Sequence, residues 1–213
     1  MAGLMLNVRS FGLCPYSQVW AQMKKFTDER SAETNDELWL VEHPSVFTLG
    51  QAGKPEHILN PGDIPIVQSD RGGQVTYHGP GQLVGYLLID LKRRRLGVRD
   101  LVSGIENTLI DFLEQQGITS QARKDAPGVY VGAAKIAALG LRVRKGRSYH
   151  GFSLNVDMDL EPFTRINPCG YEGLEVTQLR AQGVKMNVQS ASAQLVDHLK
   201  HRFGYNSVQY LTD

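Results

Sequence analysis

The sequence has few of the features that mark secreted, membrane-bound or nucleic-acid-binding proteins. Only two cysteines, Cys14 and Cys169, occur among 213 residues, so no disulfide scaffold is indicated, although one long-range bridge between them stays open. The 23 basic and 22 acidic residues nearly cancel, which argues against broad nucleic-acid binding. No apolar run reaches the roughly 18 residues of a membrane span, and the first residues lack the basic region and the length of a signal peptide. We therefore expect a cytoplasmic protein that binds neither nucleic acid nor membranes.

Motifs for nucleotides and metals are missing or incomplete. Gly79–Gly85 is one residue too long for a dinucleotide-binding G-x-G-x-x-G motif, and it leads into a predicted strand where that motif needs a helix. No phosphate-binding P-loop occurs, and residues 151–155 lack the final glycine of a serine-hydrolase elbow. His198 and His201 have a spacing that metals use, but no third ligand accompanies them, and a histidine near a helix end complements the helix dipole. We expect no metal and no cofactor.

The apolar pattern predicts strands in neighbouring groups with helices between them at irregular intervals. The predicted helices are one opened by Pro15, one over Val98–Gln116 and one over Val188–Arg202. The predicted strands are Leu4–Val8, Leu38–Val41, Val46–Leu49, Ile66–Gln68, Leu83–Leu91, Val129–Val131, Lys135–Val143 and Tyr149–Val156. This order is typical of an α+β fold. We expect residues 1–213 to form a single domain, with a small C-terminal lobe from about Asn187 as the alternative.

Cys169 is a candidate nucleophile because its neighbours constrain the backbone. Asn167-Pro168 favours a turn before it and Gly170 one after it, so the thiol can face a cleft. The alternative is a small buried hydrophobic residue, as most free cysteines are. Cys14 is a rival, since it precedes Pro15 at a helix start where the dipole can lower a thiol pKa. Its surroundings contain no base and no glycine-rich loop, so we interpret it as a core or cap residue.

Lys135 is the candidate partner of the thiol. It stands alone among small and apolar residues where a strand begins, which favours partial burial; the alternative is an extended side chain whose ammonium reaches solvent. A thiol of pKa about 8.5 is only about 3% thiolate at neutral pH. An ammonium about 4 Å away contributes about 4 kcal/mol at an effective dielectric near 20, whereas a two-unit pKa drop needs about 2.7 kcal/mol. One lysine is therefore enough to activate the thiol.

A glycine-rich segment, Arg71–Gln82, is a candidate substrate loop. It places five glycine or proline residues around aromatic and polar side chains. Glycines let a ligand approach the backbone, whose amides can then donate hydrogen bonds. The alternative is a tight hairpin between two core strands, with His78 bonded to backbone.

Several short blocks between about residues 37 and 180, some two-thirds of the chain, form a specific combination. They are Leu38–His43, Arg71–Gly73, His78–Gln82, Ala126–Val131, Lys135-Ile136, Leu139–Arg142, His150-Gly151, Leu154–Val156 and Ile166–Gly170. In this order, they together resemble the octanoyl-acyl-carrier-protein:protein octanoyltransferase family of lipoate biosynthesis.

The resemblance implies a fold shared with biotin and lipoate ligases, an α+β domain whose mixed sheet is flanked by helices and lines an acyl tunnel. It implies that Cys169 is the acyl-thioester nucleophile and that Lys135 lowers the thiol pKa. It also implies that the substrate is bound by Arg71, Gly72, Gly73, Gln74, Val75, Thr76, Tyr77, His78, Ala138, Leu139, Gly140, Gly151, Phe152 and Ser153.

The resemblance further implies the two partners of the reaction. The acyl donor would be an acyl carrier protein. The acceptors would be the lipoyl domains of 2-oxoacid dehydrogenases and the glycine cleavage H protein, in the first step of endogenous lipoate biosynthesis. Because converting a thioester to an amide is downhill, ATP would not be needed.

Basic residues could dock the acidic carrier protein. The candidates are Lys92, Arg93, Arg94, Arg95, Arg142, Arg144, Lys145 and Arg147, with a solvated basic edge as the alternative. Three other functions stay open from sequence. They are an ATP-dependent lipoate or biotin ligase, a thiol hydrolase that uses Cys169 with His78 or His150, and an acyl-binding module without catalysis.

Overall fold

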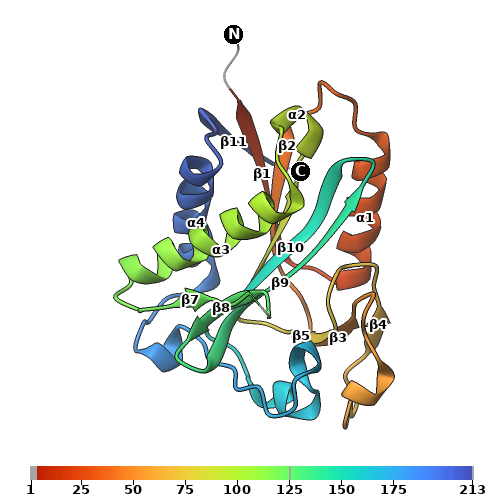
Figure 1. Cartoon of the computed structure of the whole chain (residues 1–213), viewed down its shortest axis with the longest axis vertical. Helices are drawn as coiled ribbons and strands as arrows, with labels where there is room; N and C mark the ends of the chain where they lie inside the picture. The colour runs from red at the N-terminus through yellow and green to blue at the C-terminus, as the bar shows by residue number, and fades with distance from the viewer. Residues whose placement is uncertain (1–3, 125, 213) are drawn as a thin grey trace.

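The main sheet has eight strands and is mixed. The computed structural model describes residues 4–124 and 126–212, apart from the side chain of Cys169. Strand β1 pairs in parallel with β11 and β2, and every other neighbouring pair is antiparallel. The order across the sheet is β11 (Ser207–Leu211), β1 (Met5–Leu13), β2 (Asp36–Glu42), β6 (Gln82–Leu88), β10 (Arg147–Asn155), β9 (Ala134–Arg144), β8 (Gly128–Val131) and β7 (Gln121–Ala122) (Figure 1).

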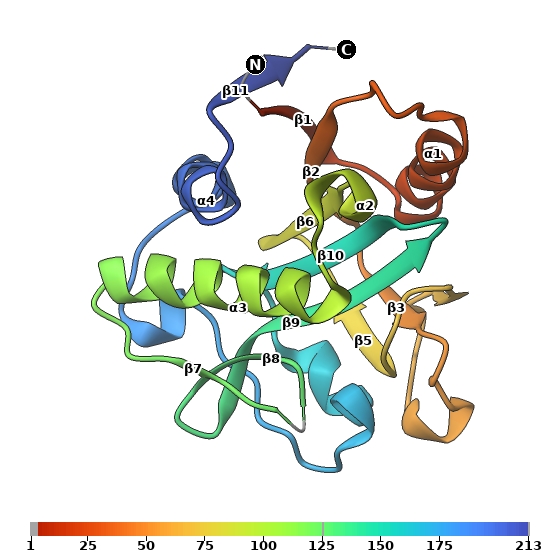
Figure 2. The same cartoon turned by 45° about the horizontal axis from the view of Figure 1, so that its top comes forward.

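Helices cover both faces of this sheet. Helices α3 (Val98–Gln115) and α4 (Val188–Arg202) pack on one face, and α1 (Tyr16–Glu29) packs on the other (Figure 2). In β6, Leu83 and Leu87 join the core under α3 and α4, whereas Val84, Tyr86 and Leu88 join the core under α1. Burial on both sides explains why β6 is apolar throughout instead of alternating.

A second, three-stranded sheet lies beside the main one. Its order is β4 (Ile66–Gln68), β3 (Val46–Leu49) and β5 (Val75–His78). It has a core of its own, formed by Phe47, Leu49, Val75, Tyr77, Met158, Phe163 and Ile166. The alternative interpretation of Arg71–Gln82, a tight hairpin between two core strands, is therefore wrong, because β5 and β6 belong to different sheets, and the turn around Gly79 carries the chain from one sheet to the other.

The short elements lie mostly between these sheets and helices. They are the helix α2 (Leu91–Arg94) and four 3₁₀ turns, η1 (Pro55–His57), η2 (Glu161–Arg165), η3 (Pro168–Gly170) and η4 (Arg180–Gln182). The prediction of a strand up to Leu91 is wrong for its last residues, because the Asp90 carboxylate accepts a hydrogen bond from Arg93 N at 3.0 Å and caps α2.

The C-terminal segment packs into the main body. Helix α4 packs against α3, and β11 extends the main sheet beside β1, so residues from Asn187 onward do not stand apart as a lobe. None of the helices in the described ranges combines the length and the apolar character that crossing a membrane requires.

A buried ion cluster links the start of β2 to α2 and to the segment before β11. The side chains of Arg30 and Asp36 are 0% and 1% exposed, with Nη2 and Oδ1 2.9 Å apart. Arg93 Nη2 lies 2.6 Å from the same Oδ1, and Tyr205 OH donates to Asp36 Oδ2 at 2.9 Å. Burial and the neighbouring Asp36 carboxylate raise the pKa of Tyr205. One carboxylate thus joins β2, α2 and the chain leading to β11.

Asp36→Ala should destabilise the protein by about 3–5 kcal/mol, because it leaves the Arg30 guanidinium buried without its anion. Urea denaturation measures the change. Asp28→Ala, which removes a pair with Arg144 whose side chains are 51% and 41% exposed, is the control and should cost less than about 1 kcal/mol. Equal losses in the two variants would contradict the importance of the cluster.

Candidate active site

The turn that contains Cys169 and the start of β9, which carries Lys135, border the same small cavity. Cys169 lies in η3, and the chain then returns to pair with Lys135. Lys135 N donates to Glu175 O at 2.8 Å, and Thr177 N donates to Lys135 O at 2.9 Å. Pro168 and Lys135 line the same small cavity. The Cys169 side chain itself lies outside the described part, so its contact with Lys135 stays a prediction.

Lys135 is buried, and the lack of a side chain at Gly128 leaves room for it. The residue is 4% exposed, and its Nζ donates to Pro127 O at 3.2 Å and lies 5.1 Å from the centroid of the Tyr130 ring. Gly128 has φ +143°, and a Cβ there would lie 2.7 Å from Ala137 O and 3.0 Å from Lys135 Cε. Only glycine fits this position. The burial confirms the first interpretation of Lys135 and contradicts a side chain that extends into solvent.

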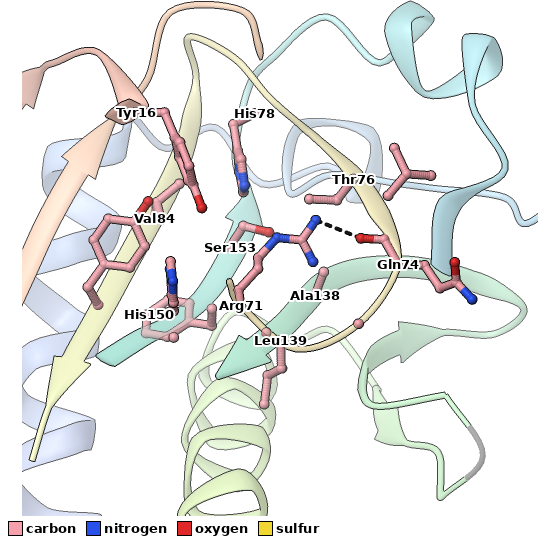
Figure 3. A pocket seen from close by; sticks show the side chains of 16 residues that line it. Tyr16, Arg71, Gln74, Thr76, His78, Val84, Ala138, Leu139, His150 and Ser153 are labelled. Carbon is pink, nitrogen blue, oxygen red and sulfur yellow. Dashed lines mark hydrogen bonds between the residues drawn. The ribbon is translucent and has the colours of Figure 1, made fainter. Parts of the chain in front are cut away.

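A larger cavity adjoins this one, and the two share Thr76, Ala138 and Ser153 in their walls. Its empty space amounts to about 480 Å³ when the open mouth is included. Its wall contains twelve of the fourteen predicted substrate residues: Arg71, Gly73, Gln74, Val75, Thr76, His78, Ala138, Leu139, Gly140, Gly151, Phe152 and Ser153. In the view of Figure 3, Gln74, Thr76 and Ala138 lie on one side, Tyr16, Val84 and His150 on the other, and Arg71 and Ser153 between them.

The other two predicted residues lie beside the cavity. Tyr77 points into the core of the small sheet, where its OH bonds Ser45 Oγ at 2.9 Å, because neighbouring strand residues face opposite ways. Gly72 N donates to Leu141 O at 2.9 Å and ties the glycine-rich segment to β9. The cavity wall also includes Tyr16, Val84, Tyr86 and His150, which sequence reasoning did not place among the substrate contacts.

Arg71 shapes the glycine-rich segment from within. Its Nη2 donates to Gln74 O at 2.8 Å (Figure 3). The same Nη2 donates to Thr48 O at 2.6 Å, and Nη1 donates to Gly72 O at 2.9 Å. Gln74 in turn lies against the Cys169 turn, since a Cβ on Gly170 would lie 3.2 Å from its Nε2. The guanidinium therefore sets the shape of the loop that packs against Gly170 in the Cys169 turn.

His78 is held neutral inside the cavity wall. Its Nδ1 lies 2.6 Å from Gln82 Oε1, and Gln82 Nε2 donates to Asn155 Oδ1 at 2.9 Å, which makes Nδ1 the protonated nitrogen. The pKa of His78 is lowered to about 3, mainly by burial and further by the neighbouring His43. A histidine this weakly basic is a poor general base near neutral pH, which counts against a hydrolase that uses His78.

His150 presents a buried acceptor atom to the same cavity. It has the left-handed φ of +60°, and its Nε2 lies 2.9 Å from Asp70 Oδ1. Burial alone would raise the pKa of Asp70, but hydrogen bonds from His150, Tyr149 and Trp20 outweigh it and lower that pKa well below the usual range. Burial lowers the pKa of His150. Its Nδ1 has no hydrogen-bond partner among the described residues, so the ring is positioned by Asp70 while Nδ1 stays available as an acceptor.

Cys14 is a buried residue away from this chemistry. It is 8% exposed, burial raises the pKa of its thiol, and its carbonyl lies 2.6 Å from His43 Nδ1. This confirms the interpretation of Cys14 as a core residue.

Most of the predicted docking arginines already have partners. Arg93 bonds Asp36, and Arg94 stacks on Tyr205 with its guanidinium carbon 4.4 Å from the ring centroid and donates to Phe203 O. Three more arginines contact neighbouring side chains: Arg142 with Gln51, Arg144 with Asp28 and Arg147 with Asp90. Charge reversal at Arg93 would therefore disturb the buried ion cluster before it reported on a docking surface.

Comparison with known proteins places this geometry in a family. The family model "Lipoyl protein ligase A/B catalytic domain" matches residues 15–200. An octanoyltransferase from Stutzerimonas stutzeri (strain A1501) is 60% identical over 200 residues, which cover 94% of this chain and 91% of the relative.

Solved structures show the same fold at low sequence identity. Lipoate-protein ligase A bound with ATP superposes with a TM-score of 0.78 at 13% identity, over 100% of this chain and 89% of the other. A biotin protein ligase from Aquifex aeolicus gives 0.55 at 10% identity, over 93% and 69%. These likenesses confirm the predicted fold. From the family match and the close relatives, the chain belongs to the lipoyl protein ligase A/B catalytic domain family and, within it, to the octanoyltransferases, enzymes of acyl transfer in lipoate biosynthesis.

Proposed function

We propose that the chain, as a single domain over residues 1–213, transfers an octanoyl group from an acyl carrier protein to a lysine of a lipoyl domain. The acyl group would travel as a thioester on Cys169. One observation carries this proposal: the buried Lys135 and the Cys169 turn border a small cavity that shares its wall with a larger, mostly apolar one. That arrangement suits a reacting carbonyl at the junction and a hydrocarbon chain beyond it.

The first half-reaction loads the enzyme. The Cys169 thiolate attacks the thioester carbonyl, and backbone N–H groups of Leu139–Gly140 or of the glycine-rich segment stabilise the oxyanion. The bond to the carrier sulfur breaks, and the departing thiolate takes a proton from the Lys135 ammonium. The products are a Cys169 thioester, a carrier thiol and neutral Lys135.

The second half-reaction delivers the acyl group. The acceptor lysine, normally protonated with a pKa of about 10.4, transfers a proton to Lys135 and attacks the thioester as an amine. When the tetrahedral intermediate collapses, the Cys169 thiolate leaves and a second proton passes to solvent. The resting ion pair is restored, and its two members titrate as one coupled system.

Residues of both sheets would bind the acyl chain. Thr76 comes from the small sheet, and Val84, Leu139 and Phe152 come from the main sheet, so the chain would lie at the seam between the two. Gly140 keeps this seam narrow, since a Cβ there would lie 3.1 Å from Gly72 O and 3.2 Å from Arg71 Cδ. The lipoyl domains of 2-oxoacid dehydrogenases and the glycine cleavage H protein are the proposed acceptors.

Incubation of the wild type with octanoyl-acyl carrier protein should add the mass of one octanoyl group, mapped to Cys169 by peptide mass spectrometry. Cys169→Ser should lower transfer to a lipoyl domain by on the order of 1,000-fold or more, because the serine hydroxyl is not ionised. Cys14→Ser is the matched control and should form the adduct normally. Transfer by Cys169→Ser that requires ATP would instead favour a ligase, and wild-type binding without any adduct would favour an acyl-binding module.

Lys135→Met should slow acyl-enzyme formation at pH 7 by roughly 25-fold, the change in thiolate fraction when a thiol pKa rises by two units to about 8.5. Methionine keeps most of the buried volume. Raising the pH toward 9 should recover part of the rate, as quenched-flow mass spectrometry can show. Lys185→Met, at an exposed position, is the control. An unchanged rate at pH 7 would contradict the proposal that Lys135 lowers the pKa of the Cys169 thiol.

Val84→Phe should shift the preferred donor to shorter acyl chains, because the larger side chain fills part of the cavity. If the substitution excludes two methylenes of the acyl chain from the cavity, the ratio of octanoyl to hexanoyl kcat/KM falls by about 15-fold, at about 0.8 kcal/mol of lost burial per methylene. Leu88→Phe, on the same face of β6 but outside the cavity wall, controls for overpacking and should keep the wild-type ratio. An unaltered ratio in Val84→Phe would place the acyl chain elsewhere.

A further inference from the structure

Glu106 is a buried carboxylate that the proposed mechanism does not use. It lies on α3 and is 8% exposed, where this helix packs against β8 and β9 (Figure 2). Burial raises the pKa of its carboxyl, and a hydrogen bond from Gly128 and the charge of Lys135 oppose that rise. A buried acidic side chain is costly unless its charge has a partner, so its position calls for a specific reason.

A single peptide group connects Glu106 with Lys135. Gly128 N donates to Glu106 Oε1 at 3.0 Å. The other end of the same peptide, Pro127 O, accepts from Lys135 Nζ at 3.2 Å. The peptide dipole therefore points its positive end at the carboxylate and its negative end at the ammonium. Each charge polarises the peptide in the direction that strengthens the other bond.

The local sequence fixes the orientation of this peptide. Proline at 127 restricts the backbone on one side, and residue 128 takes a φ of +143° that favours glycine. A Cβ at 128 would also lie 3.3 Å from Lys135 Nζ. The peptide thus cannot rotate away without disturbing the packing on Lys135.

Other ionisable groups around the pair are few among the described residues. Arg123 stacks on Tyr130 with its guanidinium carbon 4.1 Å from the ring centroid. Glu175 contributes backbone to Lys135, and its side chain is exposed. Glu106 is therefore the buried anion that these elements bring to Lys135.

We propose that Glu106 is a positioning residue that, through the Pro127–Gly128 peptide, keeps Lys135 protonated at the Cys169 turn. The proposal rests on the proposed function. A buried ammonium without an anion tends to lose its proton, and a neutral amine could neither stabilise the Cys169 thiolate nor protonate the departing carrier thiolate. Glu106 contributes a buried negative charge through this peptide, and it is not among the residues that line either cavity.

The test is the pH profile of acyl-enzyme formation by Glu106→Gln, measured by intact mass with octanoyl-acyl carrier protein. Glutamine keeps an oxygen for Gly128 N but removes the charge. The rate of acyl-enzyme formation should fall at high pH, where Lys135 loses its proton. In Glu106→Gln this fall, the descending limb of the profile, should move to lower pH by about one unit or more. Glu114→Gln, exposed on the same helix, should keep the wild-type limb. A merely structural role of Glu106 would lower the height of the profile and leave its upper limb in place, which would overturn the proposal.

Two further measurements keep the test decisive. In the Lys135→Met background, Glu106→Gln should cause no additional loss of rate, because both changes act on one group. If Glu106→Gln fails to fold, an NMR titration of ¹³C-labelled lysines in Cys169→Ser, which keeps the unacylated state in which Lys135 must be protonated, replaces it. Lys135 should then stay protonated above about pH 9, and loss of its proton below about pH 8 would overturn the proposal. Absence of any wild-type adduct on Cys169 would instead defeat the proposed function.

Discussion

The candidate active site depends on keeping a lysine side chain inside an apolar wall. Lys135 lies near the start of β9. Its backbone N–H and C=O both form hydrogen bonds, and its Nζ lies close to Pro127 O and to the Tyr130 ring. A solvent-exposed ammonium would act on a nearby sulfur through a high dielectric and would be screened by salt. Burial makes the same charge effective, and the surrounding segments must then supply every polar contact that water would have given.

Each of the two sheets contributes different parts of this site. Helices cover both faces of the main sheet, which holds Lys135 and one wall of the larger cavity. The small sheet contributes the glycine-rich segment and packs against the 3₁₀ turns before and around Cys169. Backbone contacts between them, such as Gly72 N with Leu141 O, fix the distance between the walls. The cavity is a consequence of this seam and not of a single element.

Much of this arrangement could be predicted from sequence, and the exceptions have physical reasons. The ranges of α3, α4 and β4 follow from periodicity and from helix-stop signals such as Gly117. The contribution of Tyr16 to the cavity could not be predicted, because it depends on how α1 packs across the sheet. Glu106 reads in sequence as an ordinary helical glutamate, and only tertiary packing brings it to Gly128. Strand β11 is short and mostly exposed, so its apolar pattern is too weak to reveal that it pairs with β1.

The parallel pairing of β1 with β11 has a consequence for the border of the main sheet. These two strands lie far apart in sequence and side by side in space. Without β11, one flank of β1 would expose N–H and C=O groups that lack a neighbouring strand. Deletion of Ser207–Leu211 would therefore leave that border free to pair with other polypeptides.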